Sequence, residues 1–486
     1  MSPIPQRASG VLLHVSSLPG PHAIGDLGPG AFRFIDWLEA AGQKWWQVLP
    51  LGPTGYGESP YQLISGRAGN PLFIDINALG ADAAPWDGDS SNADHAAAAQ
   101  IKTDAIHSRA ALFAESATPA ERQAFAAFQA ANPWLDEHAI FVTLKTHFDQ
   151  KPWHEWPQAY ALRDRESLAA FANRHAADLF ARKLEQFWFY KQWDAVRRYA
   201  RNKGIRIIGD CPIYVAHDSC EVWCEPELFD LDSSGQPRHI AGVPPDYFSA
   251  TGQRWGNPLY VWERHAANNY LWWRYRLAAC IRQFDLVRLD HFRGFDAYWS
   301  IPASCPTAIE GEWIKGPGRA IFDALREELG DLPIIAEDLG LLTDSVHALR
   351  DELALPGMRV LQFGFDGNPE NPHAPQNIDD NVVCYTGTHD NATTIGWFGV
   401  QDEATRQRVY QGTACGSPAE QLIDLALASP ARLAVLPLQD VLGLGDEARF
   451  NTPGVIGGNW CWRMDATAIN PASALALRNK TQLCKR

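Results

Sequence analysis

The feature that most constrains the fold of this chain is a regular alternation of short apolar segments with helical patterns. Eight segments are rich in Val, Ile, Leu or aromatic residues and are bounded by Gly, Pro, Asp or Asn, as buried strands are. They cover residues 10–18, 45–52, 205–215, 285–292, 333–340, 358–365, 381–390 and 432–443. Alternation of strands and helices predicts a parallel sheet. Eight strands in 486 residues favour an α/β fold of the (β/α)8 TIM-barrel type over an open doubly wound sheet.

Local signals at helix ends support this alternation. A long helical pattern covers residues 184–199. Ser417 and Glu420 form a capping box with Pro418 at the first helical position, which predicts the start of a late helix. One connection departs from the pattern, because residues 367–380 are rich in Pro and Asn. We therefore expect no helix between the sixth and seventh strands.

Two long stretches interrupt the barrel pattern. Residues 81–185 are mostly Ala-rich and helical in pattern, which predicts a mostly helical insertion after the second strand. Residues 220–268 predict a second insertion that is loop-like over 226–260. So long a loop in a compact domain is usually functional, and we expect the part at 242–258 to serve the active site. With these two insertions, the pattern predicts one catalytic barrel spanning residues 1–486, with no C-terminal β-sandwich domain.

Composition excludes several classes of function. The chain has 42 Lys and Arg against 57 Asp and Glu, so its net charge is −15. This acidity argues against nucleic acid and anionic membranes as partners. No segment reads as a signal peptide or approaches the ~20 apolar residues of a membrane span. Nine scattered cysteines without a CxxC pair predict a reduced, cytoplasmic protein. The 19 Trp, 22 Phe and 13 Tyr suit stacking on sugar rings or bases as well as core packing.

Acidic residues follow four of the predicted strands at their carboxyl ends. They are Asp210, Asp290, Glu337 and Asp390. In a barrel, the carboxyl ends of the strands meet at one rim, and catalytic groups come from that rim. Four like charges gathered together are unfavourable for folding, so we expect a chemical reason for them.

Two of these acids have the surroundings of a glycosidase pair. Arg288 and Asp290 are two residues apart and share one face of a strand, so the guanidinium stabilises the ionised carboxylate. An ionised carboxylate suits a nucleophile. Glu337 follows three apolar residues, and desolvation would raise its pKa, which suits a general acid. The spacing alone slightly favours the alternative, a plain salt bridge at the barrel rim.

The same region also permits a metal hypothesis. Asp290 is followed by His291, and His389 precedes Asp390, a pairing that occurs in metallohydrolase barrels. Such sites need more histidines, and His14 stands alone near the first strand. We therefore favour the carboxylate pair and expect no metal and no cofactor.

Long blocks distributed over essentially the whole chain resemble one known family. In order they are 52–57 (GPTGYG), 59–62 (SPYQ), 65–71, 209–219, 242–258 (beginning GVPPDYFSATGQ), 288–295 (RLDHFRGF), 336–340 (AEDLG), 388–391 (THDN) and 458–460 (GNW). These blocks resemble the amylomaltases, the 4-α-glucanotransferases of glycoside hydrolase family 77, which have an amylase-like barrel. Cys211 and Cys461 depart from the expected pattern inside or beside matching blocks.

The resemblance implies roles for individual residues. Asp290 would be the nucleophile, Glu337 the general acid and base, and Asp390 the group that stabilises the transition state. The loop at 242–258 would cover the acceptor side. Substrate-binding roles are implied for Arg288, His291, His389, Tyr61, Asp210, Asp246, Phe248, Trp255, Asn257, Asn459 and Tyr56.

The resemblance also implies the reaction. A segment of a 1,4-α-D-glucan would be transferred to the 4-hydroxyl of glucose or another glucan, by a retaining mechanism through a glycosyl–aspartate. Partners would be maltooligosaccharides, amylose and starch- or glycogen-derived glucans, and the chain would be a monomer or weak homodimer. The alternatives are an α-glucan hydrolase with the same triad, a catalytically inactive glucan-binding protein, and a metal-dependent barrel hydrolase.

Overall fold

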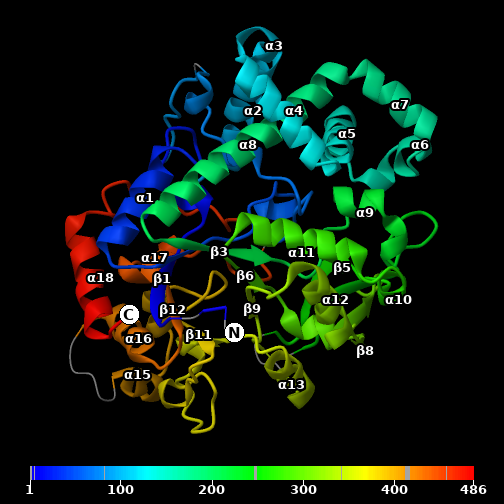
Figure 1. Ribbon diagram of the computed structural model, residues 1–486. Helices are drawn as coiled ribbons and strands as arrows, with labels where there is room; N and C mark the ends of the chain where they lie inside the picture. The colour runs from blue at the N-terminus through cyan, green and yellow to red at the C-terminus, as the bar shows by residue number, and fades with distance from the viewer. Residues whose placement is uncertain are drawn as a thin grey trace.

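Eight parallel strands form a barrel at the centre of the molecule (Figure 1). The computed structural model describes residues 3–4, 6–81, 83–245, 249–340, 342–410, 416–455 and 457–486. In chain order the barrel strands are β1 (Ala8–Leu12), β2 (Trp45–Gln47), β3 (Arg206–Cys211), β6 (Leu286–Leu289), β9 (Ile334–Ala336), β10 (Gly357–Val360), β11 (Val382–Tyr385) and β12 (Leu433–Pro437). Each overlaps one of the eight segments expected from the sequence.

The sheet nearly closes on itself. Its order is β10-β11-β12-β1-β2-β3-β6-β9, so β9 and β10 are its two ends. The backbone N–H of Ala336 donates to the carbonyl of Pro356 at 2.9 Å, and the N–H of Met358 donates to Asp338 Oδ1 at 2.6 Å. These bonds join the two ends, and the (β/α)8 prediction is confirmed.

Helices surround the barrel, as Figure 1 shows. Outside the large insertion they are α1 (Pro29–Ala40), α9 (Cys220–Cys224), α10 (Trp262–Ala267), α11 (Leu271–Gln283), α12 (Arg319–Leu329), α13 (Asp344–Glu352), α14 (Thr394–Gly399), α15 (Glu403–Tyr410), α16 (Pro418–Ala428), α17 (Leu438–Val441) and α18 (Pro471–Leu483). The predicted capping box opens α16. Residues 361–381 are all described and hold only short 3-10 turns, so the expectation of no helix there is confirmed.

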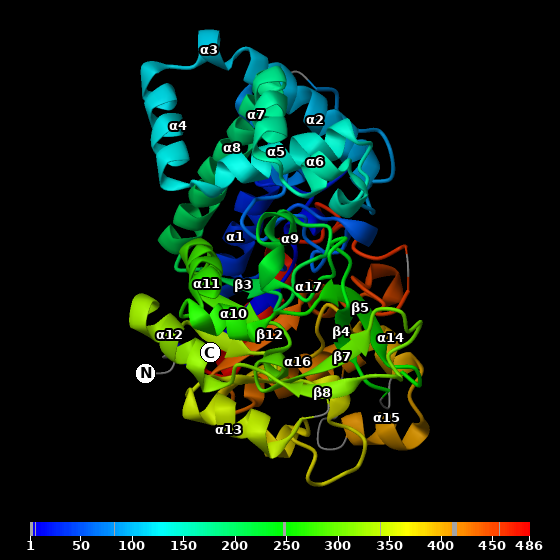
Figure 2. The ribbon, with the colours of Figure 1, turned by 90° about the vertical axis from the view of Figure 1, so that its right-hand side faces the viewer.

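A group of helices lies between β2 and β3 and stands to one side of the barrel (Figure 2). They are α2 (His95–Ala111), α3 (Phe113–Ser116), α4 (Pro119–Ala131), α5 (Trp134–His147), α6 (Gln158–Ala161), α7 (Arg165–Arg174) and α8 (Ala176–Asn202). Helix α8 packs against α2, α5 and α1, and therefore links these helices to the barrel wall. In the described part of the chain, no helix is long and apolar enough to cross a membrane.

A second, antiparallel sheet was not expected from the sequence. It contains β4 (His239–Val243), β5 (Gln253–Pro258), β7 (Ala297–Pro302) and β8 (Glu312–Lys315), in the order β5-β4-β7-β8. The prediction that 226–260 is loop-like was therefore wrong for β4 and β5. Strand β4 pairs with β5, which begins ten residues after β4 ends, and with β7, which begins about forty residues after β5, so no local turn pattern reveals the pairing with β7.

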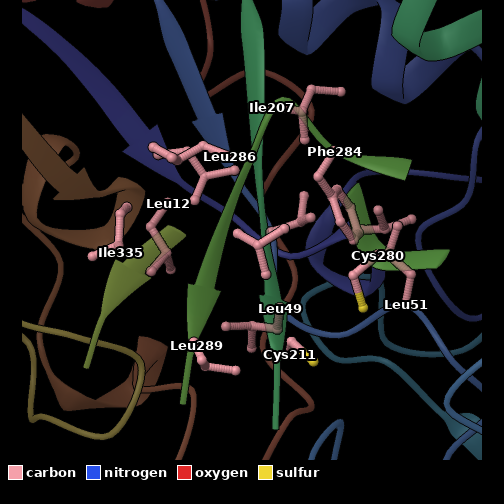
Figure 3. Close-up of a cluster of buried hydrophobic side chains, with 14 of the residues drawn as sticks. Leu12, Leu49, Leu51, Ile207, Cys211, Cys280, Phe284, Leu286, Leu289 and Ile335 are labelled. Carbon is pink, nitrogen blue, oxygen red and sulfur yellow. The ribbon is translucent and has the colours of Figure 1, made fainter. Parts of the chain in front are cut away.

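Aliphatic and aromatic side chains fill the space between the barrel strands and the helices around them. Figure 3 shows part of this core, where residues from β3 and β6 meet residues of α11. The packing is tight enough to exclude a Cβ atom at Gly209, which would lie 2.1 Å from the ring of Phe284. This contact fixes the position of β3 at Gly209, the residue that precedes Asp210.

Candidate active site

The four strand-end acids lie on one rim of the barrel. Asp210 is the last residue but one of β3, Asp290 follows β6 directly, and Glu337 follows β9 directly. Asp390 comes five residues after the end of β11. Because these strands are parallel neighbours in one barrel, their carboxyl ends bring the acids together.

A buried arginine joins two of the acids. The Arg288 guanidinium donates to Asp210 Oδ2 at 2.8 Å and to Asp290 Oδ1 at 2.7 Å. The side chains of Arg288 and Asp210 are 5% and 0% exposed, whereas that of Asp290 is 26% exposed. The Tyr61 hydroxyl also donates to Asp210 Oδ2, at 3.0 Å. Asp290 is therefore the member of the cluster that is paired with a cation and still open to a ligand.

Glu337 has the surroundings of a general acid. Burial raises its pKa to about 7, and the charge of Asp290 adds to this while Arg288 opposes it. Its two oxygens accept backbone N–H groups, from His291 at 2.6 Å and from Leu339 at 2.9 Å. His291 has φ = 50°, a left-handed conformation that is unfavourable for a non-glycine residue. This turn aims its N–H at Glu337 and holds the carboxyl beside the end of β6.

Asp390 is held by residues that sequence reasoning missed. Asn451 Nδ2 donates to Asp390 Oδ1 at 2.6 Å, and the Arg449 guanidinium donates to its backbone carbonyl at 2.8 Å. His389 Nε2 lies 3.3 Å from Asp390 Oδ2. The carboxyl remains 46% exposed, so it can still bind a ligand. Both missed residues lie in one segment, 449–451, for which no chemical motif gives a signal.

Aromatic rings line the site on two sides. Tyr61 stacks on His389 with ring centres 5.1 Å apart, and Trp460 lies 6.2 Å from Tyr61. On the other side, the Trp255 ring meets His291 edge-on at 4.8 Å. The chemistry at the rim therefore has flat apolar surfaces beside it, as a sugar-binding site requires. Trp460 was missed as a candidate, although it belongs to the GNW block.

Two of the predicted binding residues have their amides engaged within the protein. Asn257 donates to the carbonyl of Val215 at 2.9 Å and accepts from Gln62 at 3.2 Å. Asn459 accepts from the N–H of Thr452 at 2.9 Å and donates to the carbonyl of Val455 at 2.8 Å. Asn257 thus positions β5, and Asn459 shapes the loop that carries Trp460.

The other predicted binding residues are less closely connected to the site. Tyr56 is 74% exposed, and no contact joins it to the four acids in the described part of the chain. Asp246 and Phe248 lie outside the described residues. Within the described ranges, no group of three or more His, Cys, Asp or Glu is arranged to hold a metal ion. Burial lowers the pKa of His14 to about 3, so this histidine is neutral.

The arrangement defines a class of protein. A parallel barrel carries at its carboxyl rim a partly exposed, arginine-paired Asp and a buried Glu whose pKa is raised to about 7. Two carboxyl groups in such different surroundings are typical of barrel enzymes that act on glycosidic bonds.

Comparisons with known proteins give the family. The family model of the 4-alpha-glucanotransferases matches residues 13–468. A 4-alpha-glucanotransferase of Thermus thermophilus is 46% identical over 99% of this chain and 99% of its own length. One of Synechocystis sp. is also 46% identical, over 96% of this chain and 95% of its own. A solved amylomaltase from Streptococcus agalactiae in complex with acarbose has a TM-score of 0.96 at 36% identity, covering 99% of this chain and 100% of its own.

The chain therefore belongs to the 4-alpha-glucanotransferase family, glycoside hydrolase family 77. The family resemblance seen in the sequence is confirmed, and so is the assignment as a glycosyl-transferring enzyme with 4-alpha-glucanotransferase activity. The hydrolase alternative is not favoured, because relatives named 4-alpha-glucanotransferase match this chain over almost the whole length of both sequences. The residue roles remain predictions, since none of these comparisons tests them.

Proposed function

We propose that this enzyme transfers a segment of a 1,4-α-D-glucan to the 4-hydroxyl of glucose or another glucan, through a covalent glycosyl–Asp290 intermediate. One observation carries the proposal. Glu337, with its pKa raised to about 7 by burial, lies on the same rim as Asp290, which accepts a hydrogen bond from Arg288. A retaining mechanism needs one carboxyl group that can give a proton near neutral pH and a second that can attack the sugar.

The first step breaks the donor. Glu337 gives its proton to the glycosidic oxygen while Asp290 attacks C1 of the sugar, and the C1–O bond breaks. The reducing-end part of the donor leaves with a new 4-hydroxyl, and the rest stays on Asp290 as an ester. Asp390 and His389 bind hydroxyls of the reacting sugar, and the hydrogen bond from Asn451 fixes the carboxylate of Asp390 in place.

The second step makes the product. Glu337, now ionised, takes the proton from the 4-hydroxyl of the acceptor, whose oxygen attacks C1 and releases Asp290. The stereochemistry at C1 is inverted twice and so retained. Trp255, at the edge of the site beside His291, favours a sugar over water as acceptor by packing on its ring.

The proposed substrates are maltooligosaccharides, amylose and starch- or glycogen-derived glucans. The structure of the Streptococcus agalactiae relative is described as a complex with acarbose, which supports a ligand built of sugar-like rings. No cofactor or metal is assigned a step. We further propose a cytoplasmic location, which the eight free cysteines among the described residues support. We also propose that the protein is a monomer or a weak homodimer, which light scattering would test.

The product profile from pure maltotriose tests the proposed function. We expect a ladder of glucose, maltopentaose and longer chains, unchanged by EDTA and with no rise in total reducing ends. A rise in reducing ends with only glucose and maltose as products would show a hydrolase instead. Loss of the reaction in EDTA would contradict the metal-free mechanism.

A further inference from the structure

The side chain of Asp338, the residue that follows the proposed general acid Glu337, is buried and held from three directions. Its exposed fraction is 0%. Oδ1 accepts the backbone N–H of Met358 on β10 at 2.6 Å. Oδ2 accepts a hydrogen bond from Arg350 on α13 at 2.5 Å, and Arg359 Nη1 lies 3.5 Å from the same oxygen. Hydrogen bonds from guanidinium groups to carboxyl oxygens are among the strong ones, so the Asp338 carboxyl group is a fixed point of the structure.

This fixed point lies where the barrel closes. Strand β9 pairs with β6 on one side and is an end of the sheet on the other, where β10 follows. An added Cβ atom at Gly357, the first residue of β10, would lie 2.4 Å from Asp338 Oδ2. The carboxyl group therefore lies directly against the β10 backbone. It joins the end of β9, which Glu337 follows, to a strand with which β9 forms no ladder among the described residues.

The anchor of Asp338 is transmitted to Glu337 through one peptide unit. The backbone N–H of Leu339, which follows Asp338 directly, donates to Glu337 Oε1 at 2.9 Å. Because the peptide bond between Asp338 and Leu339 is planar, fixing Asp338 limits the directions in which this N–H can point. The other oxygen of Glu337 accepts the N–H of His291 at 2.6 Å. The carboxyl group of Glu337 is thus held between two backbone donors, and Asp338 sets the position of one of them.

We propose that Asp338 is a positioning residue for acid catalysis, which holds the Glu337 carboxyl group where its proton can reach the glycosidic oxygen. The inference rests on the proposed function and deepens it. Proton transfer requires hydrogen-bond reach between the acid and the leaving oxygen, so a displacement of about 1 Å can lower the rate about a hundredfold. The pKa of Glu337 is set mainly by its burial, by Arg288 and by Asp290, so we assign the effect of Asp338 to geometry.

Two donors that differ in their need for an acid test this role. Maltotriose needs a proton on its leaving oxygen, whereas α-maltosyl fluoride does not. Asp338→Asn keeps the size of the side chain but replaces one of its two accepting oxygens by an amide nitrogen. We expect it to lower kcat/KM for maltotriose about tenfold to a hundredfold, and to change the release of fluoride in the first turnover by less than about twofold. An equal loss with both donors, or normal turnover of maltotriose, would overturn the proposal.

The pH dependence separates position from charge. Glu337 is protonated well below its pKa of about 7, so at about pH 5.5 a modestly lowered pKa would cost little activity. The selective loss with maltotriose in Asp338→Asn should therefore persist at this pH. A loss that disappears there would show that Asp338 acts on the protonation of Glu337 rather than on its position, and would overturn the proposal.

Arg350 supplies variants of the same anchor that leave Asp338 in place. If Asp338→Asn does not fold, Arg350→Gln should show the same selective loss with maltotriose, and equal losses with both donors would again overturn the proposal. Arg350→Lys should recover part of the rate, because it keeps a cation. Asp351→Asn is the matched control: Asp351 accepts from the same guanidinium at 2.7 Å, but its side chain is 62% exposed, and both donors should react normally.

The unaltered enzyme separates this proposal from the proposed function. If it forms no ladder from maltotriose, the proposed function fails. If the ladder is normal and the Asp338→Asn result is negative, only the positioning role is refuted.

Discussion

At the scale of single residues, the site depends on different environments for two similar groups. Asp290 and Glu337 both follow barrel strands and both carry a carboxyl group. Arg288 contacts Asp290 directly, whereas Glu337 is buried and accepts backbone N–H groups from His291 and Leu339. The guanidinium pairs with one acid, and burial raises the pKa of the other to about 7. The division of roles therefore follows from position in the barrel rather than from residue type.

The nucleophile can be tested by an isosteric change. Asp290→Asn keeps the size of the side chain and removes the attacking oxygen, so turnover of maltotriose should fall by a factor on the order of 10⁴ or more. Glucan binding and the melting temperature should remain close to those of the unaltered enzyme. Asp331→Asn is the control, because this exposed Asp precedes β9 at the opposite end of the barrel. Near-normal turnover by Asp290→Asn would exclude the covalent mechanism.

The acid should appear in the pH profile. The leaving group needs the protonated form of Glu337, which is lost as the pH rises through its pKa of about 7. We therefore expect kcat/KM for maltotriose to fall tenfold per pH unit well above 7. With α-maltosyl fluoride, whose leaving group needs no proton, Glu337→Gln should still form the glycosyl–enzyme, and this step should lack the alkaline decline. A profile that decreases with the same midpoint in Glu337→Gln would assign the pKa to another group.

At the scale of elements, the sequence predicts what is local and fails for what is paired at a distance. All eight barrel strands were found because each is a short apolar run with its own boundary residues. The strands β4 and β5 were predicted as loop because the segment that contains them is rich in Gly and Pro, and β4 becomes an inner strand of the sheet only through its pairing with the distant β7. In the same way, Asp290 and Glu337 were found at strand ends, whereas Asn451 was missed because it contacts Asp390 from a loop 61 residues away.

The contact between β3 and α11 gives a test at this scale. A methyl group at Gly209 would overlap the Phe284 ring at 2.1 Å, so Gly209→Ala should destabilise the fold by about 1–3 kcal/mol and displace Asp210. Adding Phe284→Leu should recover part of the loss, which urea unfolding would measure as a coupling free energy. Gly399→Ala is the control, since no atom lies within 4 Å of the added methyl there. Additive effects of the two core changes would show that the overlap is relieved elsewhere.

At the scale of the whole molecule, the helices between β2 and β3 are tied to the barrel by a buried ion pair. Lys102 on α2 lies 3.0 Å from Asp26, which precedes α1, and each side chain is only 1% exposed. Lys102 also donates to the carbonyl of Ile74 at 2.8 Å. Burial lowers the pKa of Lys102, and the charge of Asp26 opposes this shift, so neither group is stable there without the other.

Breaking this pair should reveal whether the helices and the barrel unfold together. Lys102→Met leaves the Asp26 carboxylate buried without its partner and should cost about 3–5 kcal/mol. The double variant with Asp26→Asn should recover much of that cost, because both charges are then gone. Urea unfolding followed by tryptophan fluorescence and by far-UV circular dichroism would measure both values. Coincident transitions of lower midpoint would mean one cooperative unit, whereas an early transition of the helical signal alone would mean that α2–α8 and the barrel are coupled mainly through this pair.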